Sequence, residues 1–170
     1  MKRLFVIDKK DYDPNSPHSK RPSARAIIFS GEKLAMVYST RDRYYKLPGG
    51  GIDDGESNEA ALIREVREET GLCVIPESIR EYGSVLRLKK SEIYENCVFE
   101  QESFYYFCEV TDELAETSLV GYEVDEGFTL RYVTPEEALA HNKNSITENS
   151  DMINRENAVL ELLIKLPKSE

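Results

Sequence analysis

The chain has 170 residues, of which 40% are hydrophobic and 32% are charged. This length and composition are typical of a soluble globular protein, and we expect residues 1–170 to form one domain. Its 22 basic and 32 acidic side chains give a formal net charge of −10. A uniformly acidic surface repels phosphate backbones, which argues against extended nucleic acid as a partner. A small phosphorylated ligand remains compatible if cations neutralise its site.

Cysteine usage and hydropathy indicate the compartment. The three cysteines, Cys73, Cys97 and Cys108, are too few and too odd in number for a disulfide framework. No run approaches the roughly 18 apolar residues that a membrane span needs. We therefore expect a cytoplasmic protein with reduced thiols and no membrane partner.

Short apolar runs alternate with turn-rich segments along the chain. Runs typical of strands occupy 4–7, 24–29, 33–38, 82–88, 97–110 and 128–133. Gly31 lies between the second and third runs and favours a hairpin there. The segment 8–23 reads as a long connection, and 47–55, with its three consecutive glycines, reads as an irregular loop.

Helix signals follow this glycine loop and recur near the C-terminus. Ser57 is a suitable N-cap for a helix that Gly71 would end. Thr134 and Pro135 form a second N-terminal signal, and apolar spacing predicts a last helix over 154–165. The order of elements predicts an α/β (α+β) fold with one mixed sheet flanked by helices.

The first helix carries three acids on one side. Because each helical residue advances about 100°, Glu65, Glu68 and Glu69 fall within an arc of roughly 100°. Each pair of carboxylates at about 6 Å costs roughly 2.8 kcal/mol at an effective dielectric near 20. A hard divalent cation would turn this repulsion into binding energy. A solvated helix face with Arg64 paired to Glu68 is the alternative, and the glycine loop leading into the helix favours the metal site.

The spacing of these residues resembles the Nudix box. Gly50, five residues, Glu56, seven residues and then the run 64–72 reproduce each fixed position of that pattern. The resemblance implies a Nudix-like αβα sandwich, and a hydrolase that attacks a diphosphate linkage of a nucleoside diphosphate with metal-activated water. Its expected cofactor is Mg²⁺ or Mn²⁺, and its expected partner is a small phosphorylated substrate, a nucleotide.

The resemblance also implies roles for individual residues. Glu65, Glu68 and Glu69 would bind the metal together with the Gly50 carbonyl, and these acids with Arg64 form the catalytic set. Arg64 would orient the acids by salt bridging, and Glu56 would support them.

The general base and the substrate contacts are less distinctive. Glu68 and Glu69 are candidate bases within the box, and three acids of an expected loop are the alternatives: Glu123, Asp125 and Glu126. Residues upstream of the glycine loop that suit phosphate or base contacts are Arg25, Arg43 and Tyr45.

Other interpretations remain open at this point. Downstream of the box, ADP-ribose-cleaving members of the family usually carry a proline, and dinucleoside-polyphosphate-cleaving members a tyrosine. Residues 86–90 of this chain contain neither, so the sequence does not decide the substrate. A catalytically silent Nudix-fold nucleotide sensor is the alternative function, although such domains usually lack box acids that are present here. A homodimer is also left open.

Overall fold

The computed structural model describes residues 1–144 and 150–167, so parts of the expected domain 1–170 lie outside the described residues. The strands are β1 Arg3–Asp8, β2 His18–Lys20, β3 Ser23–Ile27, β4 Phe29–Ser30, β5 Lys33–Ser39, β6 Tyr44–Lys46, β7 Gly49–Gly51, β8 Leu72–Val74, β9 Arg80–Lys90, β10 Val98–Phe107, β11 Val110–Leu114 and β12 Phe128–Val133. The helices are α1 Asn58–Thr70, α2 Tyr122–Glu126, α3 Pro135–Lys143 and α4 Ser150–Ile164, with a 3₁₀ turn at Pro76–Ser78.

The largest sheet has six strands and is mixed. Its order is β1-β9-β10-β3-β7, and β2 also pairs with β10. β10 runs antiparallel to β9 but parallel to β3, and β7 returns antiparallel to β3. The β3–β7 pairing places the glycine segment directly beside Arg25, which becomes important for the site.

Two smaller antiparallel sheets complete the strand pairing among the described residues. β5 lies between β12 and β4 and also pairs with β6, whereas β8 pairs with β11. The expected single sheet is therefore divided in three, although the fold class is as predicted. The expected hairpin at Gly31 is present, because β4 pairs antiparallel with β5 across this turn, whereas β3, from the same predicted run as β4, joins the large sheet.

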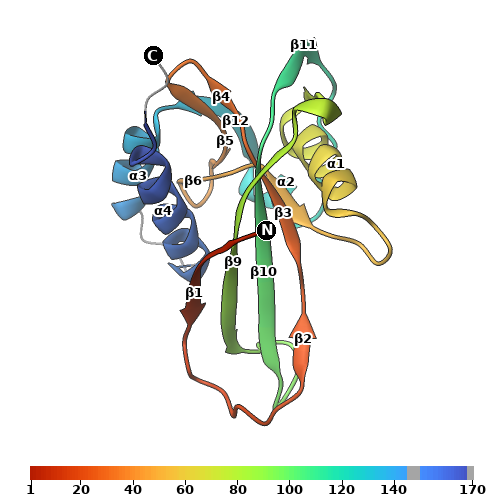
Figure 1. Cartoon of the computed structure of the whole chain (residues 1–170), viewed down its shortest axis with the longest axis vertical. Helices are drawn as coiled ribbons and strands as arrows, with labels where there is room; N and C mark the ends of the chain where they lie inside the picture. Colours follow the sequence, from red (N-terminus) through yellow and green to blue (C-terminus); the bar gives the residue numbers. More distant parts are fainter. Residues whose placement is uncertain (145–149, 168–170) are drawn as a thin grey trace.

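The helices cover opposite sides of the strands. Figure 1 shows α1 on one side and α3 with α4 on the other. Beneath α1, Leu62 and Val66 pack in a core with Ile28 of the sheet region. On the other side, Val159 and Leu160 of α4 pack in a second core with residues of β3, β5 and β10. The two cores fix α1 and α4 against the sheet, so side chains on their inner faces are held rigidly.

The capping residues in the sequence predicted where α1 and α3 begin. Two segments predicted as loops contain strands, because they pair with distant parts of the chain. α1 and α3 begin after Ser57 and Thr134, and α1 ends at Gly71 in the left-handed conformation, as predicted. The prediction that the glycine segment is irregular is wrong. Gly49–Gly51 form strand β7, which pairs with β3. The connection 8–23 likewise contains β2, and the acids at 123–126 lie in helix α2 and not in a loop. No described helix combines the length and apolarity needed to cross a membrane.

Candidate active site

Helix α1 is fixed at both ends by local hydrogen bonds. The Ser57 hydroxyl accepts a hydrogen bond from the Ala60 amide at 3.1 Å, and the Gly71 amide donates to the Arg67 carbonyl at 2.9 Å. Its apolar face is buried against the core. Because α1 packs with this face against the core, Glu65 and Glu69 point inward, and Glu69 is only 1% exposed.

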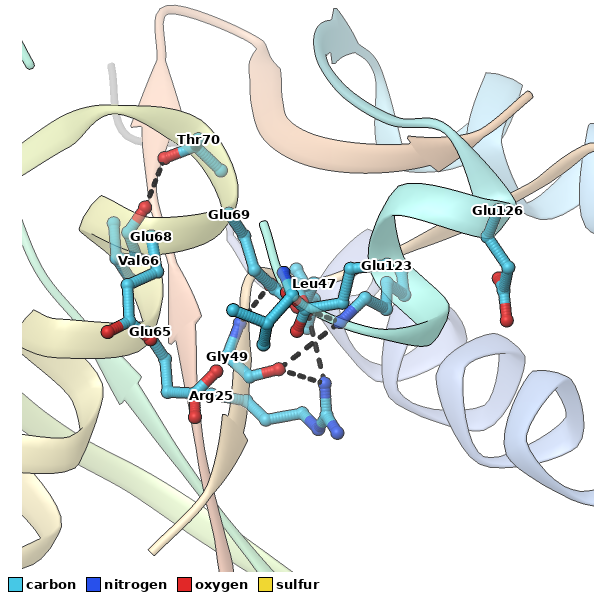
Figure 2. A network of polar contacts seen from close by, with 12 residues as sticks. Arg25, Leu47, Gly49, Glu65, Val66, Glu68, Glu69, Thr70, Glu123 and Glu126 are labelled. Carbon is cyan, nitrogen blue, oxygen red and sulfur yellow. Dashed lines mark hydrogen bonds and ion pairs between the residues drawn. The ribbon is translucent and has the colours of Figure 1, made fainter. Parts of the chain in front are cut away.

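Three buried or nearly buried acids meet at the end of α1. Carboxylate oxygens of Glu65, Glu69 and Glu123 lie within 4.8 Å of one another. Glu65 and Glu69 come from α1, and Glu123 comes from α2 (Figure 2). Burial raises the pKa of Glu65 above its ordinary value, and burial followed by the charge of Glu69 raises that of Glu123. Such a group of oxygen ligands has the composition of a site for a hard divalent cation.

The glycine segment approaches these acids so closely that side chains are excluded. The Gly49 amide donates to Glu69 Oε2 at 2.9 Å. Gly49 has a φ of 136°, and a Cβ there would lie 2.1 Å from the Ala24 carbonyl oxygen. A Cβ at Gly50 would lie 2.3 Å from Glu65 Oε2. Gly49 is therefore required by its close packing on β3, and Gly50 by its close packing on the Glu65 carboxylate.

Arg64 links the remaining acids of the box. Its Nε donates to Glu56 Oε1 at 2.9 Å, and its Nη1 donates to Glu65 Oε1 at 2.7 Å and to Glu68 Oε2 at 3.2 Å. The Arg64 guanidinium lowers the pKa of Glu56 to about 2. Arg64 thus has the contacts that an orienting residue needs, with Glu56 as its counter-ion.

Glu68 lies apart from the buried acids. Its side chain is 37% exposed and lies outside the close group of three carboxylates. It lines a groove between α1 and the segment after β11, together with Arg67, Glu116 and Ser118. A role at this outer rim therefore suits Glu68 better than a place among the buried acids.

Lys46 is a site residue that lies outside the three substrate contacts preferred from the sequence. The residue is 2% exposed, and its ammonium forms an ion pair with Glu69 and donates to the Gly49 carbonyl at 3.3 Å. The only local signal is its position just before Leu47, Pro48 and the glycines. The contact with Glu69 spans 23 positions in the sequence, so it arises from tertiary packing alone.

The other candidate residues are dispersed. Glu126 accepts a hydrogen bond from the Tyr44 hydroxyl at 2.6 Å, and Figure 2 shows it directed away from the acid cluster. Asp125 is exposed on the same short helix, and Arg43 is exposed beside α3, where its carbonyl lies 2.8 Å from His141 Nε2. The Tyr45 ring is buried against Tyr38 and His141, as part of the core.

Arg25 is the substrate-contact candidate that reaches the site. It is buried on β3, and its Nη1 donates to the Gly49 carbonyl at 2.8 Å. Gly49 therefore joins two polar groups, because its amide binds Glu69 and its carbonyl binds Arg25.

Comparisons with known proteins identify the family of this chain. The NUDIX domain model matches residues 19–153. An RNA pyrophosphohydrolase from Sulfurovum sp. (strain NBC37-1) is 30% identical over 119 residues, which cover 64% of this chain and 73% of that protein. Nudix hydrolase 25 from Arabidopsis thaliana is 35% identical over 60 residues, covering 34% of each chain, so this match spans much less than the relative's length.

Solved structures share the fold at low sequence identity. The MutT protein from Bacillus halodurans has a TM-score of 0.55 at 16% identity, covering 86% of this chain and 83% of that one. The MutT Nudix hydrolase from Burkholderia pseudomallei has a TM-score of 0.52, also at 16% identity, covering 82% and 98%. With the domain model spanning most of the sequence, the chain belongs to the Nudix hydrolase family.

Proposed function

We propose that this chain hydrolyses a diphosphate linkage in a nucleoside diphosphate joined to another group, using a divalent cation held at the acid cluster. The observation that carries this proposal is the meeting of Glu65, Glu69 and Glu123 within 4.8 Å, where the backbone of Gly50 packs against the Glu65 carboxylate with no room for a Cβ. Nudix hydrolases generally use divalent metal cations, and Mg²⁺ or Mn²⁺ is the choice that fits an all-oxygen ligand set.

The acid cluster fits such a cation electrostatically. Three carboxylates this close repel one another, and Lys46 contacts only Glu69 of the three. When bound, the cation offsets the charge of the diphosphate and lowers the pKa of the attacking water. The Gly50 carbonyl and Glu68 remain proposed contributors at the edge of this ligand set.

The chain's own residues orient the reacting groups. Arg64 holds Glu65, and the Gly49 amide with Lys46 holds Glu69, so both acids are positioned before substrate arrives. Glu123 is our first choice as general base, because its buried carboxylate reaches the cluster from α2, outside the box, and burial raises its pKa above the ordinary value. In that role it would leave Glu65 and Glu69 as the buried acids that hold the cation. Glu68, at the groove, is the alternative base.

The substrate is proposed to be a small phosphorylated nucleotide. The Sulfurovum relative is named an RNA pyrophosphohydrolase, which supports hydrolysis of a pyrophosphate linkage. The surplus of acidic side chains in the chain opposes long contacts with a nucleic-acid backbone. We also propose a single domain and a cytoplasmic location, consistent with its three free cysteines.

A panel of nucleoside triphosphates, nucleotide sugars and dinucleotides with Mg²⁺ tests this function. We expect turnover that stops in EDTA, and the released phosphate, pyrophosphate or nucleoside monophosphate identifies the bond that is cleaved. Glu69→Gln provides the inactive control. Metal-independent turnover would contradict the mechanism, and silence across the panel with retained nucleotide binding would support the sensor function instead.

A further inference from the structure

A layer of three arginines lies between the large sheet and α4. Arg25 comes from β3, Arg87 from β9 and Arg155 from α4. Arg155 is 1% exposed, Arg25 is also buried, and Arg87 is partly buried. Buried arginines are rare unless they are paired with anions, so the partners of this layer are informative.

The sheet register brings these side chains to one face. β10 pairs Tyr105 with Arg25 on one side and Gln101 with Arg87 on the other. Alternate residues of a strand share a face, so Gln101 and Tyr105 face the same layer. Arg155 Nη1 and Arg87 Nη2 both donate to Gln101 Oε1, at 2.8 Å and 3.0 Å. The three arginines therefore surround one strip of β10.

The positive charge of this layer exceeds its negative charge. Arg155 pairs with Glu156 at 2.8 Å, and Glu156 also accepts the Leu47 amide. The nearby Asp151 pairs with Lys9 at 2.5 Å and does not supply a further free charge. Burial and the charges of Arg155 and Arg25 lower the pKa of Arg87 to about 10. Among the described residues, the three guanidinium groups thus have one carboxylate in a direct ion pair with them, that of Glu156.

The same layer contains donors without acceptors. The Nε atoms of Arg25, Arg87 and Arg155 are buried and have no hydrogen-bond partner within the described structure. The hydroxyl of Tyr105 is also buried without a partner, and burial raises its pKa to about 12, so it stays protonated. These atoms can all donate, so their missing partner is an acceptor, and the excess positive charge of the layer favours an anion.

We propose that Arg25, Arg87, Arg155 and the Tyr105 hydroxyl bind a phosphate group of the substrate that is separate from the metal-bound diphosphate. Guanidinium groups bind phosphate through charge-assisted bonds, and a dianionic phosphate matches the excess charge of the layer. Gly49 connects this subsite to the acid cluster, since it contacts both Arg25 and Glu69. The substrate class is then a nucleotide with a further phosphate beyond the cleaved bond.

The identity of this ligand as substrate rests on the proposed function, but anion binding at the arginines does not. Without metal the acid cluster repels phosphate, so inorganic phosphate in EDTA reports on the arginine layer alone. We expect phosphate to raise the melting temperature of the full chain, whereas sodium chloride at equal ionic strength does not. In Arg87→Gln the phosphate affinity should fall at least tenfold, and in Lys90→Gln, on the same strand but exposed, it should not change.

A second measurement separates an anion site from a structural role. Arg87→Gln removes one of three mutually repelling cations, so in phosphate-free buffer it should melt no lower than wild type. With an active substrate, Arg87→Gln should raise KM at least tenfold and leave kcat nearly unchanged. An absent phosphate response, or an equal response in Arg87→Gln, overturns the subsite even if hydrolysis is observed. Phosphate binding without hydrolysis supports the subsite and contradicts the proposed function.

Discussion

Lys46 and Glu69 form an ion pair that is almost fully removed from solvent, at the point where β6 ends and the glycine segment begins. Glu69 is also held by the Gly49 amide, so its two oxygens have fixed partners before any metal binds. A carboxylate in this position is costly unless a cation accompanies it. Lys46 supplies that cation in the absence of metal.

Lys46→Met should therefore destabilise the protein. Removing one partner of a buried ion pair costs about 3–5 kcal/mol, because the other charge stays buried and unpaired. Urea unfolding in EDTA measures the loss, and Mg²⁺ should recover part of it by restoring a cation beside Glu69. Lys143→Met is the matched control, since the Lys143–Glu161 pair is exposed and screened by solvent, so its loss should change stability little. Equal losses in the two variants would contradict the role of Lys46.

Glu123→Gln tests the acid contributed from outside the Nudix box. The amide keeps the size of the side chain but cannot accept a proton or carry charge, so turnover should fall by about 10²–10⁴-fold. Asp125→Asn, exposed on the same helix, should leave turnover within about twofold. Steady-state kinetics with Mg²⁺ distinguish these variants. Comparable activity of Glu123→Gln and wild type would remove Glu123 from the site.

Glu68→Gln tests the acid at the groove. As a metal contact or alternative base, Glu68 should be needed for turnover, and we expect a loss of about 10²–10⁴-fold without unfolding. Glu116→Gln changes another acid of the same groove and should have little effect. Circular dichroism confirms that both variants fold. If Glu68→Gln is nearly as active as wild type, the catalytic acids are confined to the buried cluster.

Gly50→Ala should disturb catalysis through geometry alone. The added methyl group would lie 2.3 Å from Glu65 Oε2 and must displace that carboxylate. A shift of about 1 Å in a catalytic group can reduce the rate by about 10²-fold. Gly51→Ala is the matched control, because nothing lies within 4 Å of a Cβ there. Retained activity in both variants would show that Glu65 tolerates displacement.

The Glu56–Arg64 pair should make stability depend on pH. The folded pKa of Glu56 is about 2 against an ordinary value of 4.5. A lowered folded pKa stabilises the protein above pH 4.5, and this contribution is lost as the pH falls through about 2. Wild type should therefore exceed Glu56→Gln in unfolding free energy near neutral pH. Chemical unfolding across this range should show the difference shrinking on acidification, and a constant difference would contradict the charge-based role.

The sequence predicted elements whose signals are local. Ser57 and Gly71 bound α1 through hydrogen bonds to residues three or four positions away, so side-chain chemistry at each end was sufficient. The same holds for Thr134, whose capping box begins α3. The strand Phe128–Val133 was also predicted at its observed bounds, from a short run of β-forming residues.

Pairing between distant segments could not be predicted in the same way. The glycine segment 49–51 has no side chains to indicate a strand, and it becomes β7 only because β3 offers hydrogen bonds to it. Glu123 showed no distinguishing mark among the acids near it, and the short helix α2 alone turns it toward Glu65 and Glu69.

The sequence by itself determined the family, the helix that carries the acids of the box and the contacts of Arg64 with them, because the spacing of residues on one helix and its preceding loop defines them. Tertiary structure alone decided the third buried acid, the Lys46 counter-ion and the arginine layer beneath α4. Each of these depends on strands or helices that are distant in sequence. Charge repulsion and desolvation act through space, so the partners of a buried charge are set by packing and cannot be read from neighbouring residues.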